Sequence, residues 1–249
     1  MAPTLLIIAG PTASGKTDVS IKLAQHWKTE IISCDSRQMY REMSIGTAKP
    51  DPYQLSLVPH HLINNLSIHD YYSAFLFEQD VLELLKDLFS RHSIVIMTGG
   101  TGLYMDAILN GIDDIPDPDP IIRSQLKQRY ENEGLENILQ EVSILDPEFY
   151  NQVDKKNPAR VLRGMEVCLT TGRPFSSFRI KHPVNRDFNI LLTGLELPRN
   201  LLYERIDQRV DQMIATGLVK EAEALHPMKH LNGLNTVGYR ELQEWLQCQ

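Results

Sequence analysis

The chain has 249 residues, of which 42% are hydrophobic and 23% are charged, which excludes a disordered or fibrous protein and allows one large or two small domains. Its three cysteines, Cys34, Cys168 and Cys248, are odd in number and far apart, so we expect reduced thiols in a cytoplasmic protein. The sequence contains no recognisable signal peptide and no apolar run near the roughly 18 residues of a membrane span, so no membrane partner is expected.

The net charge of −7 argues weakly against a nucleic-acid partner, but the charges are unevenly distributed. Residues 1–122 carry a net charge of −7 and residues 187–249 one of −3, whereas residues 123–186 carry 11 basic and 8 acidic side chains, a net of +3. Nucleic-acid phosphates respond to local fields rather than to the total charge. The middle region is therefore the candidate contact surface, with an ordinary solvated helical surface as the alternative.

A glycine-rich motif near the N-terminus reads G-x-x-x-x-G-K-T and consists of Gly10, Pro11, Thr12, Ala13, Ser14, Gly15, Lys16 and Thr17. It follows an apolar run and precedes a helical pattern, which is the context a P-loop requires. Its glycines let successive N–H groups point at one anion, and the helix adds its positive end. Lys16 supplies a point charge and Thr17 a hydroxyl for Mg²⁺. The motif predicts a phosphate site, although not which phosphate.

Apolar runs alternate with helical patterns along much of the chain. The runs expected as buried parallel strands are Leu5–Gly10, Glu30–Asp35, Ser93–Thr98 and Asn189–Leu197. The helical patterns between them are Asp18–His26, Tyr71–Ser90 and Leu103–Leu109. This alternation predicts an α/β fold, a P-loop NTPase-like parallel sheet flanked by helices.

Two proline-containing segments divide the chain. Asp113–Pro120 has three prolines within five residues and cannot continue a helix or a central strand. A helical pattern follows from Ile121 to about Lys181, and His182–Asn185 is expected to lead back. We therefore predict a catalytic core of residues 1–113 and 187–249, and a mostly helical insertion of residues 114–186.

Asp35 ends the second predicted strand, at the sheet edge where the P-loop also lies. It could bind magnesium in an NTPase, act as a general base in a transferase, or cap a turn. The third strand ends in Gly99–Tyr104, a second glycine-rich turn with Thr101 as a hydroxyl donor. A hydrolytic NTPase would often carry an acid at that point.

Arginines recur at helical spacing in two regions. Arg205 and Arg209 lie within Leu201–Leu225, predicted as one helix, and either reach a leaving phosphate or form surface ion pairs. We expect its apolar stripe to be buried, namely Leu202, Ile206, Val210, Met213 and Ile214. Arg160 and Arg163 share one side of a helix in the basic region, suited to phosphate contacts or to salt bridges.

Adjacent His60 and His61 are expected to pack and hydrogen bond rather than bind a metal, because neighbouring ligands have poor geometry.

Together these segments resemble the tRNA dimethylallyltransferases, in collinear order over nearly the whole chain. The segments that carry the resemblance are Gly10–Thr17, Asp35–Tyr40, Ile45–Pro50, Pro59–Ile63, Gly99–Tyr104, Asn157–Val167, Arg205–Met213 and Val237–Glu241.

The resemblance implies transfer of a dimethylallyl group from dimethylallyl diphosphate to the exocyclic amine of an adenosine beside the tRNA anticodon. The P-loop, Thr17 with Mg²⁺, and Arg209 would hold the diphosphate, and Asp35 would accept the proton from the amine. Thr101 would lie near the reacting centre. Positions matching the family's tRNA contacts are Asp35, Ser36, Arg37, Gln38, Thr101, Arg123, Arg160, Arg163, Gly238, Tyr239 and Arg240.

The target base would leave the anticodon stack to reach the cavity, while the insertion grips the anticodon stem-loop. A monomer is expected. The chain departs from the family at Asn157, where Asp is frequent, and at Gln249, where it ends before a basic helix that members usually carry. The ending is expected to reflect a natural short form, a truncated gene or a trimmed protein.

Three alternatives remain at this stage. An adenylate isopentenyltransferase would share the P-loop and the base, but the basic insertion and Pro59–His61 favour the tRNA enzyme. A small-molecule P-loop kinase would need lid arginines that the sequence does not identify. A non-catalytic tRNA-binding remnant would be free to lose Lys16, Asp35 and Arg209, all of which are present.

Overall fold

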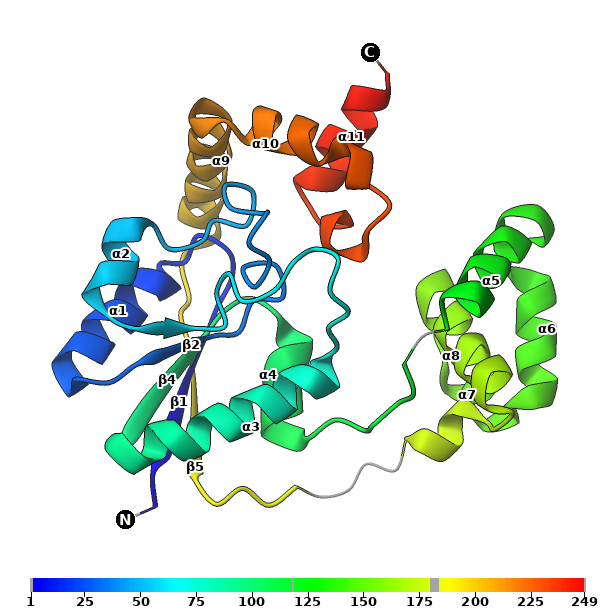
Figure 1. The fold of residues 1–249 in the computed structure, drawn as a ribbon, viewed down its shortest axis with the longest axis horizontal. Coiled ribbons are helices and arrows are strands. Elements are labelled where there is room, and N and C mark those ends of the chain that lie inside the picture. The colour runs from blue at the N-terminus through cyan, green and yellow to red at the C-terminus, as the bar shows by residue number, and fades with distance from the viewer. Residues whose placement is uncertain (1, 118, 180–183, 249) are drawn as a thin grey trace. The chain divides into compact units, whose positions relative to one another are not determined.

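The computed structural model describes residues 2–117, 119–179 and 184–248 (Figure 1). Its contacts divide the chain into a core unit, Met1–Asn110 with Asn185–Gln249, and a helical unit, Gly111–Val184. The boundaries predicted from the prolines were 113/114 and 186/187. Within the two predicted connections, Pro118, His182 and Pro183 lie outside the described residues.

The core unit is built on a five-stranded parallel sheet with the strand order β3-β2-β4-β1-β5. Its strands are β1 (Thr4–Ala9), β2 (Ile31–Ser33), β3 (His60–His61), β4 (Ile94–Thr98) and β5 (Asn189–Gly194). This confirms the predicted α/β fold with a parallel sheet. Strand β3 was not predicted, because two polar histidines do not form an apolar run.

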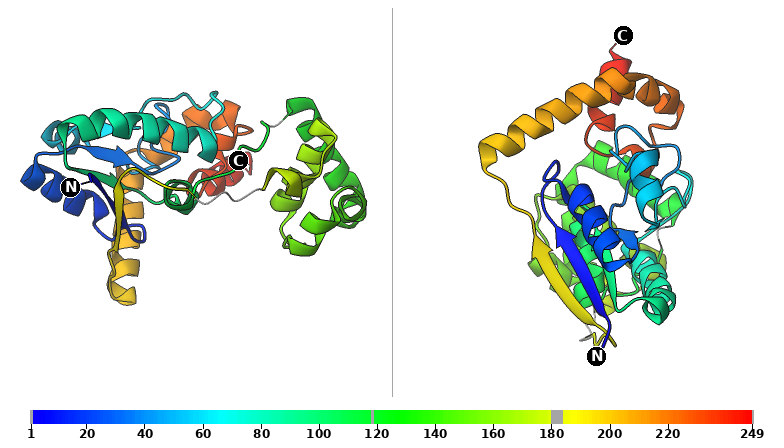
Figure 2. Two further views of the ribbon diagram at one scale, coloured as in Figure 1. Left: turned by 90° about the horizontal axis from the view of Figure 1, so that it is seen from below. Right: turned by 90° about the vertical axis from the view of Figure 1, so that its left-hand side faces the viewer.

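Helices cover both faces of the central strands (Figures 1 and 2). Helix α1 (Lys16–Trp27) lies on one face with α2 (Pro52–Leu57), and places Ile21 and Ala24 against Leu6, Ile8 and Ile96 of the sheet. Helices α3 (Ala74–Arg91) and α4 (Gly102–Asn110) lie on the other face. Strand β1 is almost completely buried between them, so its carboxyl end provides a rigid base for the P-loop.

The prediction that Asn189–Leu197 forms a buried strand is wrong in its burial. Strand β5 is one of the two edge strands of the sheet, and Leu191 and Leu192 are 57% and 52% exposed. An apolar run indicates a strand, but it does not indicate which neighbours cover that strand.

The predicted single helix Leu201–Leu225 is two helices. α9 (Arg199–Thr216) and α10 (Leu218–Leu225) meet at Gly217, whose φ of 109° is a left-handed conformation that glycine adopts readily. The predicted stripe on α9 is also not buried: none of the residues Arg199–Thr216 is buried, and Val210 and Ile214 are 45% and 52% exposed.

The C-terminal elements pack on a segment that follows β2. After α10 come two 3₁₀ turns, η2 (His226–Met228) and η3 (Asn232–Leu234), and then α11 (Tyr239–Gln247). Leu225, Leu234 and Tyr239 form a buried cluster with Tyr40, Met43 and Ile68. This cluster fixes the residues that lead away from Asp35.

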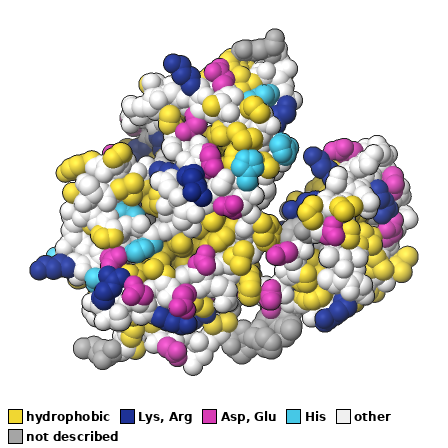
Figure 3. Space-filling model, in the orientation of Figure 1, with side chains coloured by type: hydrophobic (Ala, Val, Ile, Leu, Met, Phe, Trp, Pro, Cys, Tyr) yellow, Lys and Arg dark blue, Asp and Glu magenta, His cyan; other side chains and the backbone are white. Residues whose placement is uncertain are grey.

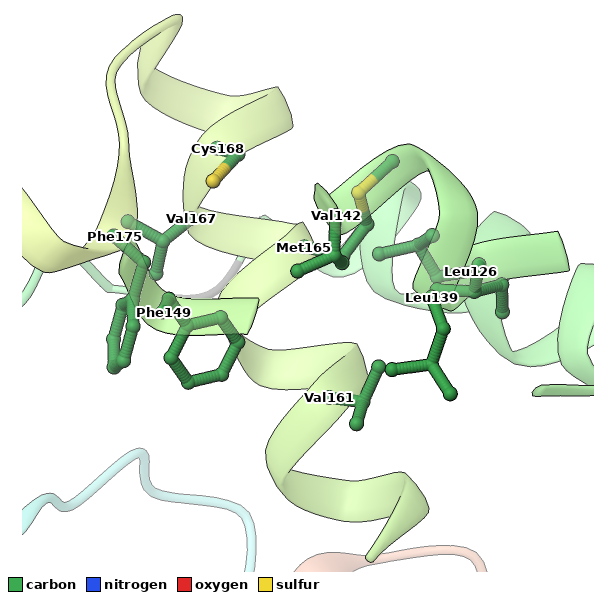
Figure 4. Close-up of a cluster of buried hydrophobic side chains, with 10 residues drawn as sticks. Leu126, Leu139, Val142, Phe149, Val161, Met165, Val167, Cys168 and Phe175 are labelled. Carbon is green, nitrogen blue, oxygen red and sulfur yellow. The ribbon is translucent and has the colours of Figure 1, made fainter. Parts of the chain in front are cut away.

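The helical unit contains α5 (Pro120–Glu133), α6 (Leu135–Leu145), α7 (Pro147–Gln152), α8 (Pro158–Thr171) and the turn η1 (Phe175–Phe178). Proline begins α5, α7 and α8, each after a side chain that caps the helix: Asp119, Asp146 and Asn157. Asn157, the departure noted in the sequence, thus serves as an N-cap. Figure 4 shows the unit's own apolar core, in which Phe149 and Phe175 lie together beside Val167.

None of the helices in the described ranges is sufficiently long and apolar to cross a membrane.

A candidate active site at the carboxyl edge of the sheet

The P-loop connects the end of β1 to the start of α1. Gly15, just before the helix, has a φ of 90°, and Ala13 has one of 63°. These left-handed residues curl the backbone, as a loop that directs N–H groups at an anion requires. Lys16 bends back over the loop, and its Nζ donates hydrogen bonds to the carbonyl oxygens of Gly10 and Pro11, each at 2.7 Å.

The P-loop borders a cavity of about 320 Å³. Asp35, after β2, and Arg209, on α9, line the same cavity, together with Arg205. The structure therefore brings the predicted base and the predicted phosphate-binding arginine to the P-loop. The remaining wall residues are Thr12–Asp18, Ile31, Ser33, Gln38, Ala48, Pro50, Gln54, His60, Ile63 and Thr98–Gly100.

Positive charge is concentrated in this cavity. Burial lowers the pKa of Lys16, the neighbouring Arg209 lowers it further, and Asp35 acts in the opposite direction. Burial likewise lowers the pKa of Arg209, against the influence of Asp35. Two cations held close together in a partly buried space are stabilised by a multivalent anion. The site therefore suits a diphosphate.

The donor set fits a metal ion held jointly with phosphate oxygens. Among the described residues there is no cluster of three or more His, Cys, Asp and Glu side chains suited to a metal. Mg²⁺, however, commonly takes only one or two protein oxygens and completes its shell with phosphates and water. Thr17 offers such an oxygen at the start of α1, in the cavity wall.

Thr101 holds the loop that carries Asp35. Its Oγ1 accepts a hydrogen bond from the backbone N–H of Ser36 at 2.9 Å and donates to the Ser36 hydroxyl at 3.2 Å. The Asp35 carboxylate accepts from the backbone N–H of Arg37 at 2.9 Å. The Arg37 N–H thus orients the Asp35 carboxylate directly, and Thr101 fixes the adjacent residue Ser36.

The sequence model of the IPP transferase family matches residues 38–249. The chain belongs to this family. It is 49% identical over 244 residues to tRNA dimethylallyltransferase 1 of Bacteroides thetaiotaomicron, covering 98% of this chain and 79% of that protein. It is 50% identical over 242 residues to tRNA dimethylallyltransferase 2 of Porphyromonas gingivalis, covering 97% and 81%.

Solved structures agree with this family assignment. The tRNA isopentenylpyrophosphate transferase of Bacillus halodurans is similar with a TM-score of 0.67 and 32% identity, over 100% of this chain and 78% of that one. A eukaryotic dimethylallyltransferase acting on tRNA is similar with a TM-score of 0.75 over 99% of this chain and 64% of that one. At 24% identity, the second likeness bears on the fold alone.

Several cavity residues of this IPP transferase family member were not identified from the sequence as site residues. Pro50, Gln54, His60 and Ile63 form part of the wall. They lie in irregular segments or on short elements, where periodicity gives little signal. The available signal was the family resemblance, since Pro50, His60 and Ile63 lie within its segments Ile45–Pro50 and Pro59–Ile63.

The predicted tRNA-contacting residues of the core unit differ in accessibility. Tyr239 is fully buried, and its hydroxyl donates to Glu221 on α10. Arg240 is exposed and pairs with Glu241 at 2.8 Å. Gly238 precedes α11 with a φ of 89°. Arg37 donates to the carbonyl of Asn232 at 3.2 Å.

In the helical unit, Arg123 and Arg163 share one carboxylate. Both pair with the buried Glu166 on α8, at 2.9 Å each. Arg160, also on α8, is exposed. On the face of the unit visible in Figure 3, Lys and Arg side chains are interspersed with Asp and Glu, so the local positive excess is modest.

Proposed function

We propose that this chain transfers the dimethylallyl group of dimethylallyl diphosphate to the N6 amine of the adenosine adjacent to the tRNA anticodon, releasing diphosphate. The observation that carries the proposal is the joint lining of one cavity by the P-loop, Asp35 and Arg209. The relatives named tRNA dimethylallyltransferase, which match almost the whole chain, support the same reaction.

The diphosphate would lie on the P-loop. Backbone N–H groups, the α1 N-terminus, Lys16 and Arg209 would stabilise the charge that grows as it leaves. Thr17 would hold Mg²⁺ together with the diphosphate oxygens, and the bound ion would supply further charge neutralisation. The Lys16 ammonium donates to two carbonyls of its own loop, so an arriving anion competes with those hydrogen bonds.

The chemical step forms a carbon–nitrogen bond. The N6 lone pair attacks the allylic carbon, the carbon–oxygen bond to diphosphate breaks, and its electron pair leaves with the diphosphate. The nitrogen then sheds a proton, which Asp35 accepts. Thr101, through Ser36, keeps the Asp35 loop in place for that transfer.

An adenosine in an anticodon loop must leave its stack to reach a cavity of this kind. We propose that the helical unit binds the anticodon stem-loop through Arg123, Arg160 and Arg163, with Arg37, Gln38 and Arg240 as contacts on the core unit. We further propose that the enzyme is a cytoplasmic monomer. The thiols of Cys34, Cys168 and Cys248 are free, in keeping with a reducing compartment.

Phosphoryl transfer is disfavoured by the end of β4. Thr98–Gly100 lines the cavity without contributing a carboxylate, whereas a hydrolytic NTPase often carries an acid there. The acid of this site lies instead after β2, beside the cations that would hold the leaving group.

The test offers the purified protein dimethylallyl diphosphate and Mg²⁺ with an anticodon stem-loop and AMP in parallel, and identifies products by nucleoside mass spectrometry. We expect the modified adenosine in the stem-loop, and its loss in Asp35→Ala and Arg209→Ala. Asp187→Ala and Arg199→Ala, which change exposed residues, are the matched controls. Removing Arg209 should lower kcat by about 10²–10³-fold, as for other groups that stabilise developing charge.

Product on AMP alone would replace the tRNA assignment with an adenylate isopentenyltransferase. In a separate reaction with ATP and a small acceptor, formation of ADP would indicate a kinase instead.

A further inference from the structure

The carboxylate of Glu221, on α10, lies in a cradle of backbone N–H groups from the segment after β2. It accepts hydrogen bonds from Ser44 at 3.1 Å, from Ile45 at 3.0 and 3.1 Å, and from Gly46 at 3.1 Å. Successive N–H groups that converge on one anion form a binding concavity. Here the anion is a side chain of the protein itself, which lies on a helix about 175 residues further along the chain.

Packing keeps this cradle in one arrangement. A Cβ on Gly46 would lie 2.5 Å from the ring of Tyr239 and 2.9 Å from Leu218, so only glycine fits there. The Tyr239 hydroxyl donates to the same Glu221 carboxylate. Burial and that bond raise the pKa of Tyr239, so it stays protonated and remains a donor.

The cradle continues directly into the cavity wall. The carbonyl oxygens of Thr47 and Ala48 each accept a hydrogen bond from Nε2 of Gln38 at 3.2 Å. Ala48 has a φ of 45°, a left-handed conformation that its surroundings must maintain. Gln38 and Ala48 both line the cavity with Asp35.

We infer that Glu221 is a positioning residue for the acceptor side of the reaction. By fixing Ser44–Gly46 it places the Thr47 and Ala48 carbonyls, which in turn hold Gln38 beside the base Asp35, where an adenine would enter. The P-loop, which would bind the diphosphate, does not depend on Glu221, because Lys16 donates hydrogen bonds to carbonyl oxygens within the loop itself. This inference rests on the proposed function for its kinetic consequences.

The main variant is Glu221→Ala in the full chain, with the exposed Glu223→Ala on the same helix as the control. We expect kcat/KM for the stem-loop to fall by about 100-fold, the scale of a small misplacement of reacting groups. The Kd for inorganic diphosphate, measured by calorimetry, should stay unchanged. Because the three N–H groups remain, added formate should restore part of the turnover of Glu221→Ala and leave Glu223→Ala unaffected.

A double-mutant cycle tests the route through Gln38. If Glu221 acts by holding that side chain, Glu221→Ala should cost little further activity in a Gln38→Ala background. Independent roles would give additive losses. Should Glu221→Ala fail to fold, the isosteric Glu221→Gln replaces it, with an intermediate loss expected because one acceptor oxygen remains.

Hydrogen exchange gives a readout that does not depend on catalysis. Glu221→Ala should lose protection at the amides of Ser44–Gly46, and Glu223→Ala should not. If the unaltered protein modifies no stem-loop, the proposed function fails, and the exchange result alone decides whether the cradle fixes this segment. Equal loss of diphosphate binding and turnover, additive behaviour with Gln38→Ala, or unchanged exchange would each overturn the inference.

Discussion

Gly99 lies directly against Cys34: a Cβ on Gly99 would be 2.1 Å from the carbonyl oxygen of Cys34 and 2.8 Å from its Cα. The backbone N–H of Cys34 donates to the carbonyl of Thr98 at 2.7 Å, which joins the ends of β2 and β4. This close approach brings Asp35 next to the glycine-rich turn, since a Cβ on Gly100 would lie 3.7 Å from its carboxylate.

Gly99→Ala should therefore disrupt the site, because the clash is with backbone atoms that cannot rotate away. We expect a loss of at least about 1–3 kcal/mol in the free energy of unfolding, the cost of overpacking, together with lost turnover. Gly102→Ala is the matched control, since a Cβ added there would extend into open space. Urea unfolding and stem-loop turnover compare the two. Equal stability of both variants would contradict the packing account.

Lys16→Ala should weaken diphosphate binding. A hydrogen bond to a charged group contributes about 1.5–3 kcal/mol, which corresponds to a Kd raised about 10–100-fold. Calorimetry with inorganic diphosphate and Mg²⁺ measures this change. Lys22→Ala, an exposed lysine on the same helix, should bind as the unaltered protein does. An unchanged Kd in Lys16→Ala would place the diphosphate elsewhere.

Glu30, directly before β2, links that strand to β3 and to the end of α3. Its carboxylate contacts His61 at 2.7 Å, Arg91 at 2.5 Å and His92 at 3.1 Å. Burial by itself would raise the pKa of Glu30, but hydrogen bonds with these partners outweigh it and lower the pKa from 4.5 to about 2. Since the folded pKa is depressed, the stabilisation is present above about pH 4.5 and is lost as the pH falls towards about 2.

Glu30→Gln should therefore lower the melting temperature at pH 7, and its deficit should shrink as the pH falls from about 4.5 towards about 2. Thermal unfolding at a series of pH values measures this difference in melting temperature. Glu83→Gln changes a carboxylate that is 77% exposed, so its difference from the unaltered protein should be small throughout. A deficit for Glu30→Gln that does not depend on pH would show that the ionised group is not responsible.

Arg186 is anchored in the core unit by a buried ion pair. It contacts Glu78 on α3 at 2.5 Å and donates to the carbonyls of Ala107 and Ile108 at 3.0 and 3.1 Å. The two side chains are only 10% and 7% exposed. Removing one partner of a buried pair typically costs about 3–5 kcal/mol, because the other charge stays buried.

For Arg186→Ala we expect the free energy of unfolding of the core unit, measured by urea unfolding, to fall by about 3–5 kcal/mol. The exposed Lys86→Ala, on the helix that carries Glu78, should stay within about 0.5 kcal/mol of the unaltered protein. A similarly small change in Arg186→Ala would mean that solvent reaches the pair.

The layers of the fold could be predicted from the sequence because apolar runs and the P-loop are local signals. Which neighbours cover each strand and helix could not be predicted. The runs at β5 and α9 indicated buried elements, yet β5 lies at an edge and α9 buries none of its residues. Periodicity identifies the apolar face of an element and says nothing of what covers it.

The candidate site shows the same division. Lys16 and Asp35 are marked by a motif and by the end of a strand, so the sequence placed them at one edge. The Glu221 cradle depends on a contact between segments about 175 residues apart, formed by backbone N–H groups that carry no sequence signature. Such a contact could be found only in the folded chain.

The central claim is that the P-loop holds a diphosphate leaving group while carbon is transferred. Its most direct test is a single reaction with dimethylallyl diphosphate labelled in the allyl carbon, an anticodon stem-loop and Mg²⁺, in which label on the nucleoside and free diphosphate are counted together. We predict one diphosphate released for each modified adenosine, and neither product from Asp35→Ala. Diphosphate released with no label on the nucleoside, or phosphate transferred to an acceptor in a parallel reaction with ATP, would contradict the account.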